Sequence, residues 1–246
     1  GVLREIRALE NRVSMTPAGV EVMKQHGHAV LVEQSAGAGS DFPDTQYAAA
    51  GATIMENPGE IYARADLVMH VKEPQPSEYG MIRPGQVVFT YFHFASNEQL
   101  TRAYMQTDAV AIAYETVEGP RGGLPLLNPM SEVAGRMAVQ EAARYCERFH
   151  GGRGILLGGV TGVLPATVLI LGGGIVGSNA ALMAAGLGAR VYILDTNLDR
   201  LRHLCEIMPK NCIPLMSSAA IIRQLAVDAD VIIGAVLVAG ARTPKL

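Results

Sequence analysis

The segment Thr167–Asp195 reads TVLILGGGIVGSNAALMAAGLGARVYILD, and it predicts how the second half of the chain folds. Its leucine-rich start is typical of a buried strand, its alanine-rich middle of a helix, and RVYILD of a second strand. Gly172, Gly174 and Gly177 follow the first strand with the spacing G-x-G-x-x-G. In this strand–helix–strand context, the motif predicts a Rossmann unit that binds a dinucleotide.

Each glycine of the motif is expected to have a separate role. Gly172 permits the tight turn, Gly174 lets the backbone approach the pyrophosphate, and Gly177 lets the helix pack close to the strand. The N–H groups near Ile175 and Val176, together with the helix dipole, are expected to hold the pyrophosphate.

The acidic residue at the end of the second strand indicates which dinucleotide is bound. Asp195 can accept hydrogen bonds from the adenosine ribose and would repel a 2′-phosphate, so NAD is favoured over NADP. Arg200 has two interpretations: it offsets that repulsion, or it lies on the next helix near the adenosine, and the second is favoured. A later segment, Val231–Val236, is expected to be a strand whose small apolar end lies against the cofactor.

The first half of the chain alternates helix and strand signals. Thr16, followed by proline, is typical of a helix start, and Gly27 is typical of a helix end. Further helices are expected at 44–50 and after the capping box SNEQ, with Ser96 as the N-cap. Strands are expected at His28–Glu33, Leu67–Val71, Gln86–Tyr91 and Ala109–Tyr114. This alternation predicts an α/β fold with a mainly parallel sheet.

Three ionisable residues directly follow three of these strands: Lys72, His93 and Glu115. Ligands of parallel sheets bind beyond the carboxyl ends of the strands, so the shared position favours a functional site that contains Lys72 and His93. The alternative for each residue is an ordinary solvated strand end. For His93, in the aromatic run TYFHFA, a second alternative is a histidine buried in the core.

Composition limits the class of protein. The 246 residues are 49% hydrophobic and carry a net charge of −3 with both signs scattered, so no nucleic-acid partner is expected. The three cysteines lack metal or redox spacing, which favours reduced thiols, a cytoplasmic protein and no metal site. The charge-free stretch 154–189 contains Pro165 and the glycine loop, which argue against a membrane span.

The Gly- and Pro-rich segment 119–130 is a natural domain boundary. It predicts an N-terminal α/β substrate domain at 1–128 and a Rossmann NAD-binding domain at 129–246. Ser131 is expected to cap a long helix at about 132–149.

Several stretches spread along the chain carry a family resemblance: ENRVSMTPAGV, VKEP, YFHFA, AYETVE, PLLNPMSEVAGRMA, GGRGILLGGVTGV, the glycine loop with VYILD, and GAVLVAGARTPKL. Together they resemble alanine dehydrogenase. The resemblance implies reversible, NAD-dependent oxidative deamination of L-alanine to pyruvate and ammonium, carried out by a homo-oligomer, a hexamer in this family.

The resemblance also implies residue roles. Arg12 in ENRV and Lys72 in VKEP would bind the carboxylate and carbonyl region of the substrate, and His93 in YFHFA would be the acid/base group. Met130 would lie near the nicotinamide. The NAD site would be lined by Ser131, Ile175, Val176, Asp195, Arg200, Ser217, Val236 and Leu237. These residue types suit the chemistry, because arginine binds carboxylates bidentately and imidazole transfers protons near neutral pH.

The sequence stops at ARTPKL, whereas the family continues with further strands, an aspartate near the nicotinamide and segments that return to the first domain. We therefore expect an incomplete nucleotide-binding domain and little or no dehydrogenase activity from these 246 residues alone.

Other functions stay open. One is the NAD-binding subunit of a proton-translocating transhydrogenase, which shares the RV-x-x-TP opening. Another is an NAD-binding or assembly module without catalysis. A third is a dehydrogenase for glycine or another small 2-amino acid.

Overall fold

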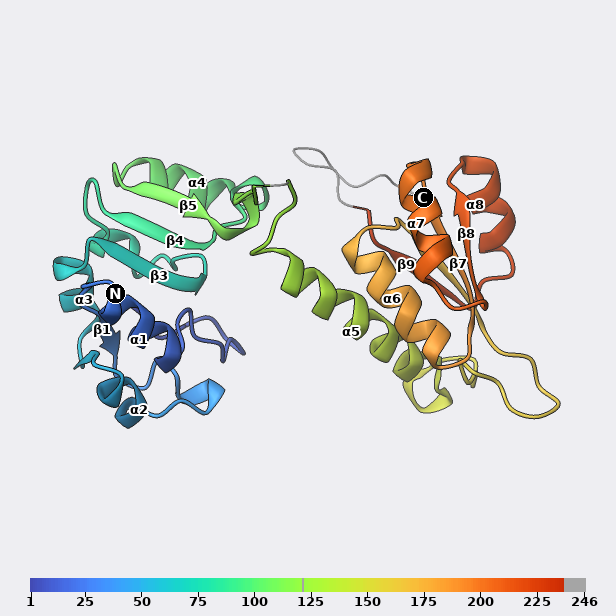
Figure 1. Ribbon diagram of the computed structural model, residues 1–246, viewed down its shortest axis with the longest axis horizontal. Coiled ribbons are helices and arrows are strands. Elements are labelled where there is room, and N and C mark those ends of the chain that lie inside the picture. Colours follow the sequence, from blue (N-terminus) through green and yellow to red (C-terminus); the bar gives the residue numbers. More distant parts are fainter. Residues whose placement is uncertain (121, 237–246) are drawn as a thin grey trace. The chain divides into compact units, whose positions relative to one another are not determined.

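The computed structural model describes residues 1–120 and 122–236, and it divides the chain into two compact units, Gly1–Leu127 and Asn128–Leu246 (Figure 1). Every strand pairing between the named strands of both units is parallel, and helices connect successive strands. The predicted α/β class is therefore confirmed.

The first unit contains two short parallel sheets, β1-β2 and β3-β4-β5. Their strands are β1 (Leu31–Glu33), β2 (Thr53–Met55), β3 (Leu67–Lys72), β4 (Val87–Tyr91) and β5 (Val110–Ala113). Val2 links the sheets, because it forms parallel bridges to both Val32 and Met69. The strand predicted at 28–33 is shorter than expected because its partner β2 offers only three residues for pairing.

The helices of the first unit are α1 (Pro17–Gln25), α2 (Asp44–Ala49), α3 (Pro58–Arg64) and α4 (Glu98–Met105). Short 3₁₀ turns lie between them: η1 (Ala38–Ser40), η2 (Tyr79–Met81), η3 (Phe94–Ser96) and η4 (Tyr114–Thr116). The predicted cap of α4 is wrong by one residue. Asn97 accepts the N–H of Leu100 at 3.0 Å, whereas Ser96 belongs to η3 and donates its hydroxyl to the carbonyl of His93.

The second unit has one parallel sheet with the strand order β8-β7-β6-β9. Its elements are β6 (Thr167–Leu171), α6 (Ile175–Gly186), β7 (Arg190–Asp195), α7 (Leu198–Ile207), β8 (Cys212–Met216), α8 (Ala219–Ala226) and β9 (Val231–Gly234). The chain moves outward from β6 to β8 and then returns to the other side of β6. This reversal creates the crevice beyond the strand ends in which doubly wound sheets bind nucleotides.

The long helix α5 (Asn128–Cys146) begins and ends earlier than the predicted helix at 132–149, and it is followed by η5 (Arg148–His150). Ser131 therefore lies inside the first turn and is not the cap. Pro129 suits that turn because the N–H that proline lacks would have no partner there. The helix ends where the carbonyl of Cys146 accepts the N–H of Gly154 at 2.8 Å.

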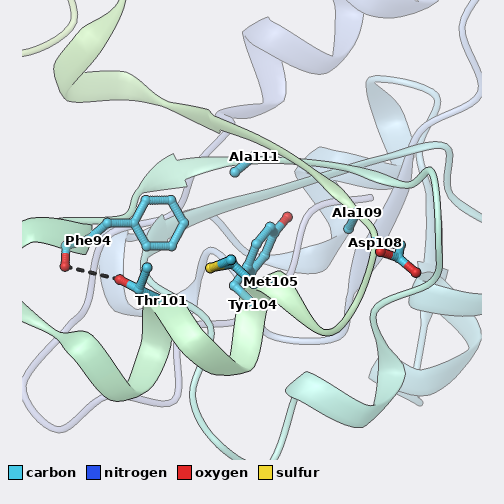
Figure 2. Close-up of a pocket in the computed structure, with 7 residues that line it drawn as sticks. All are labelled: Phe94, Thr101, Tyr104, Met105, Asp108, Ala109 and Ala111. Carbon is cyan, nitrogen blue, oxygen red and sulfur yellow. Dashed lines mark hydrogen bonds between the residues drawn. The ribbon is translucent and has the colours of Figure 1, made fainter.

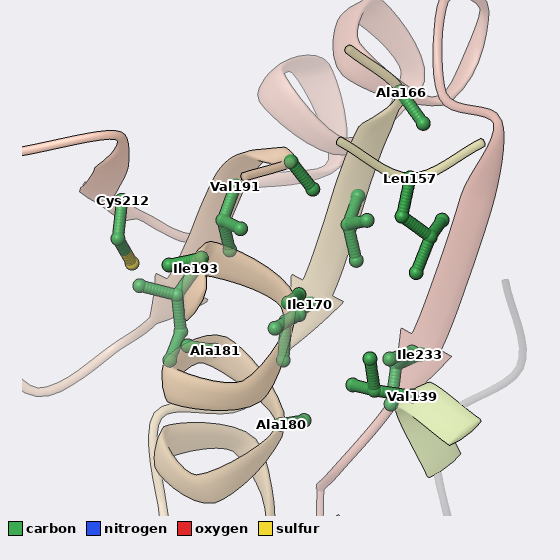
Figure 3. Close-up of a cluster of buried hydrophobic side chains, with 14 of the residues drawn as sticks. Val139, Leu157, Ala166, Ile170, Ala180, Ala181, Val191, Ile193, Cys212 and Ile233 are labelled. Atoms are coloured by element: carbon green, nitrogen blue, oxygen red, sulfur yellow. The ribbon is translucent and has the colours of Figure 1, made fainter. Parts of the chain in front are cut away.

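The core of the second unit lies between its sheet and the paired helices α5 and α6 (Figure 3). Small side chains let these layers approach: Ala180, Ala181 and Ala184 of α6 are fully buried. A Cβ at Gly135 of α5 would lie 2.2 Å from the carbonyl oxygen of Val176. Within the described residues, no helix combines the length and the apolar character needed to cross a membrane.

Candidate active site and dinucleotide site

Strands β3 and β4 bring two predicted site residues to the same edge of the sheet. Lys72 pairs in register with Tyr91, and Tyr91 lies two positions before His93. The pairing register of β3 and β4 shifts between Met69 and Lys72. The hydroxyl of Thr90 donates to the carbonyl of Lys72 at 2.8 Å. The end of β3 is thus held by a side chain of β4 as well as by the ladder, and Lys72 emerges next to the end of β4.

His93 has an unusual backbone conformation. Its φ of 52° and ψ of 38° lie in the left-handed region, which costs a residue with a side chain about 1–2 kcal/mol. Two contacts hold it there: Glu115 accepts its N–H at 2.7 Å, and Ser96 donates to its carbonyl at 2.8 Å. The His93 residue is exposed, so the alternative of a buried core histidine is wrong. Such a conformation at a strand exit is typical of functional sites.

The aromatic residues around His93 divide between the core and the site. Phe92 is fully buried and stacks on Phe94 with ring centroids 4.5 Å apart. Tyr91 is half-buried, and its ring lies parallel to the His93 imidazole at 6.1 Å and edge-on to Tyr114 at 4.9 Å. The Tyr91 hydroxyl donates to the carbonyl of Leu126. The packing orients the imidazole on one side and leaves its other side accessible.

A group of charged side chains lies around Arg12 and Lys72 in the first unit. Arg12 donates from Nε to Glu10 at 2.7 Å, and this pairing raises the pKa of Arg12 and lowers that of Glu10. The ammonium of Lys72 also lowers the pKa of Glu10. Burial raises the pKa of Tyr91, and Glu115 adds to that effect while Arg12 opposes it. These effects place Arg12 near Glu10 and Tyr91, and Lys72 near Glu10, while His93 contacts the ring of Tyr91.

Two cavities of the first unit differ in character. One of about 230 Å³ is polar and contains Glu5, Glu10 and Arg12 among its lining residues. The other, of about 490 Å³, is mainly apolar and lies between α4 and β5 (Figure 2). Its lining includes Phe94, Tyr104 and Met105, and neither cavity is lined by Lys72 or His93. The polar cavity is the better candidate for binding a small charged substrate because Arg12 lines it.

The glycine loop of the second unit has the geometry of a close nucleotide approach. Gly172 has a φ of 104°, and a Cβ there would lie 2.6 Å from the carbonyl oxygen of Ala235. A Cβ at Gly177 would lie 1.8 Å from the carbonyl oxygen of Gly172, so helix and loop are in direct contact there. A Cβ at Gly174 would meet no described atom within 4 Å. Gly174 is thus the position at which the backbone faces open space at the start of α6.

Asp195 and Arg200 both contact this loop. Asp195 accepts the N–H of Gly173 at 2.7 Å with one oxygen and that of Asn197 at 2.8 Å with the other. Arg200, on α7, donates from Nε to the carbonyl of Gly173 and from Nη2 to the Ser178 hydroxyl at 3.3 Å. The Arg200 guanidinium therefore binds the loop from α7, the helix on which it was expected, and its position near the adenosine stays a prediction.

The remaining predicted cofactor residues lie at several elements of the second unit. Ile175 and Val176 form the first turn of α6, and Ser131 lies one helical turn before the contact of Gly135 with Val176. Ser217 donates its N–H to the carbonyl of Asp195 at 2.9 Å. Val236 follows Ala235, next to Gly172, and Leu237 lies outside the described residues. Met130 lies in the first turn of α5.

The sequence does not predict a functional role for three residues of the site: Glu5, Glu10 and Tyr91. The only signal for Glu10 is its position two residues before Arg12, and that for Tyr91 is its place in the aromatic run TYFHFA. Among the residues that the structure describes, no group of three His, Cys, Asp or Glu side chains is placed to hold a metal ion.

Comparisons of sequence place the chain among known proteins. The family profile described as "Alanine dehydrogenase/PNT, N-terminal domain" matches residues 1–134, and "Alanine dehydrogenase/PNT, C-terminal domain" matches residues 138–246. The whole chain is 49% identical to an alanine dehydrogenase of Methanococcus maripaludis and 50% identical to one of Bacillus subtilis. It spans 66% and 65% of the lengths of these two relatives.

Comparisons of structure agree. An L-alanine dehydrogenase superposes with a TM-score of 0.91 at 47% identity, over 99% of this chain and 67% of that one. A transhydrogenase from Sinorhizobium meliloti superposes with a TM-score of 0.82 at 25% identity, over 100% of this chain and 71% of that one.

Proposed function

The chain belongs to the alanine dehydrogenase/PNT family, and from this premise we propose that it carries the substrate and NAD sites of an alanine dehydrogenase. The reaction is the reversible conversion of L-alanine, NAD⁺ and water into pyruvate, ammonium, NADH and a proton. The observation that carries this proposal is the position of Lys72 and His93 at the neighbouring ends of β3 and β4, with Arg12 close enough to Tyr91 to affect its pKa, in a chain about half identical to alanine dehydrogenases.

The residues of the glycine loop fit NAD. The space beside Gly174 and the strand-order reversal at β6 suit a pyrophosphate, which the first N–H groups of α6 would hold. Asp195 would bind the adenosine ribose, with Ser131, Arg200, Ser217, Val236 and Leu237 around the cofactor. When bound, NAD supplies the hydride acceptor of the reaction.

The substrate residues divide the chemistry among them. Arg12 binds the substrate carboxylate, and Glu10 holds its guanidinium in a fixed orientation. Oxidation at Cα leaves an iminium that water attacks, and the resulting carbinolamine must lose ammonia. Lys72 polarises the oxygen that becomes the keto group. His93 accepts a proton from the attacking water and donates one to the leaving nitrogen, as suits an imidazole near neutral pH.

A direct test is the formation of NADH from L-alanine by the purified chain, compared with glycine and other small 2-amino acids. We expect turnover of L-alanine when the chain is extended by the C-terminal third of a curated relative, and the 246 residues alone are measured beside it. Dehydrogenation of a different amino acid at a higher rate would correct the substrate. Failure of both versions to reduce NAD with any of these substrates would contradict the proposed function.

A second candidate is the NAD-binding subunit of a transhydrogenase, which the superposition with the transhydrogenase favours. The identity of 25%, against 47% for the L-alanine dehydrogenase, makes it the weaker candidate. Hydride exchange between NADH and an NADP analogue without alanine-dependent reduction would support it. NADH binding without either reaction would support a non-catalytic module.

Asp195→Asn should weaken NADH binding by about 10- to 100-fold and narrow the preference for NADH over NADPH. The amide has one acceptor oxygen in place of the two that hold Gly173 and Asn197, and losing a hydrogen bond to a charged group costs about 1.5–3 kcal/mol. Fluorescence titrations with both nucleotides measure the change. Asp199→Asn, at an exposed position of α7, is the matched control. An unchanged ratio of the two affinities would refute a ribose-binding role for Asp195.

We also propose a cytoplasmic location and a homo-oligomer. The exposed side chains of Leu156, Val160 and Leu164, which are 67%, 58% and 79% accessible in the second unit, support association between chains.

A further inference from the structure

A buried polar cluster lies behind the strand end that carries Lys72. Its centre is His70 of β3, which is 2% exposed. The Nδ1 of His70 lies 3.4 Å from Glu5, and its Nε2 lies 3.4 Å from Glu78 and 3.0 Å from the Tyr62 hydroxyl. The side chains of Glu5 and Glu78 are 4% and 6% exposed. The imidazole is thus enclosed between two carboxylates and a phenol.

Glu5 connects this cluster to the site. One of its carboxylate oxygens accepts the N–H of Val71 at 2.6 Å, and the other accepts the N–H of Lys72 at 3.2 Å. These are the last two residues of β3, where the pairing register with β4 shifts. A side chain from the N-terminal segment therefore takes the place of a strand partner and determines the direction in which the chain leaves the sheet.

The rest of the cluster leaves His70 little freedom. The Tyr62 hydroxyl also donates to Glu78 at 3.3 Å, and the other oxygen of Glu78 accepts the N–H of Gln75 at 2.7 Å. Glu33 of β1 interacts electrostatically with His70 and Glu78 as well. Glu5 therefore lies between the His70 imidazole on one side and the N–H groups of Val71 and Lys72 on the other, so His70 limits where this carboxylate can lie.

We propose that His70 is a positioning residue for Lys72. His70 holds the carboxylate of Glu5 in place, and Tyr62 and Glu78 hold the opposite side of His70. Glu5 in turn holds the backbone that presents the Lys72 ammonium to the substrate oxygen. This inference rests on the proposed function, because that function assigns Lys72 to the keto oxygen.

The test measures the NMR signal of the Lys72 ammonium group itself. The chain has four lysines, at 24, 72, 210 and 245, so ¹³C-methylated lysines give few NMR signals while keeping their charge. Titrating pyruvate into the chain gives an affinity from the Lys72 signal. Amide exchange of Val71 and Lys72 is measured in parallel. NADH affinity serves as a check that the second unit is intact.

The variants remove the cluster in steps. His70→Leu removes both ring nitrogens, and His70→Gln keeps a polar side chain at this position. Tyr62→Phe removes the hydroxyl that contacts His70 and Glu78, and Tyr47→Phe is its matched control. Both tyrosines are fully buried, but the Tyr47 hydroxyl donates to the carbonyl of Met15, outside the cluster. Thermal unfolding of the two phenylalanine variants compares the purely structural costs. Should His70→Leu fail to fold, the pair of phenylalanine variants carries the test.

We expect His70→Leu to weaken pyruvate binding by about 10- to 100-fold, the scale of a misplaced site group, and His70→Gln to weaken it less. Exchange of the Val71 and Lys72 amides should accelerate by about 10-fold or more. Tyr62→Phe should move both readouts in the same direction, and Tyr47→Phe should move neither. NADH affinity should stay the same throughout.

Pyruvate binding by His70→Leu that equals that of Tyr47→Phe would overturn the inference, and so would unchanged amide exchange at Val71 and Lys72. A Lys72 NMR signal that does not change when pyruvate is added to the unsubstituted chain is a different result. It counts against the proposed substrate, and the amide exchange together with the resting Lys72 signal then decides the role of His70.

Discussion

His93→Ala lowers the turnover of L-alanine by about 100- to 10,000-fold, the usual loss when an acid/base group is removed. The reference is a version of the protein extended to the full length of its curated relatives. The imidazole is exposed beyond the end of β4 and packs only along one side, against Tyr91. Its loss should therefore leave NADH affinity nearly unchanged. Steady-state absorbance of NADH measures the rate, and fluorescence titration measures the affinity.

Two controls separate the side chain from the backbone at this position. His93→Gly removes the same imidazole, but glycine adopts a φ of 52° without steric cost, so it should be as inactive as His93→Ala and more stable. His28→Ala, at an exposed position of the first unit, should be fully active. A normal rate per folded molecule, combined with a collapse of thermal stability and NADH affinity, would show that His93 serves the fold and not the chemistry.

Gly177→Ala abolishes measurable NADH binding and destabilises the second unit by about 1–3 kcal/mol or more, the scale of overpacking. The added Cβ would lie 1.8 Å from the carbonyl oxygen of Gly172 and 3.0 Å from its carbon. Both are backbone atoms of the loop, so no side chain can move aside to relieve the clash. Either the loop opens or α6 shifts away, and both changes displace the N–H groups expected to hold the pyrophosphate.

The same segment offers two matched controls for this substitution. A Cβ at Gly186, the last residue of α6, meets nothing within 4 Å, so Gly186→Ala should bind NADH normally and gain up to about 1 kcal/mol of stability. Gly174→Ala also meets no described atom, with a φ of −66°, so it should keep the fold and lose NADH affinity. Thermal unfolding and fluorescence titration separate the three variants. Normal NADH binding by Gly177→Ala would contradict the assigned loop geometry.

The local patterns predict some elements of each unit and miss others, among them β2, α3, β8 and α8. The strand expected at the leucine-rich start of Thr167–Asp195 is β6, because a long apolar run followed by glycines has few other solutions. The three-residue strands β1 and β2 give weaker signals: the first was predicted too long, and the second was not predicted. The choice between Ser96 and Asn97 as the N-cap of α4 depends on a turn at His93 that the sequence pattern does not show.

By itself, the sequence determined the α/β class, the glycine loop and the positions of Lys72 and His93 at the ends of their strands, because these follow from spacing within short segments. Only the tertiary structure decided that Glu5 holds the end of β3 and that His70 is enclosed between Glu5 and Glu78. Glu5 and Val71 are 66 positions apart in the chain, and local spacing carries no information about contacts at that separation. The left-handed backbone of His93 was also decided there, because it depends on the distant carboxylate of Glu115.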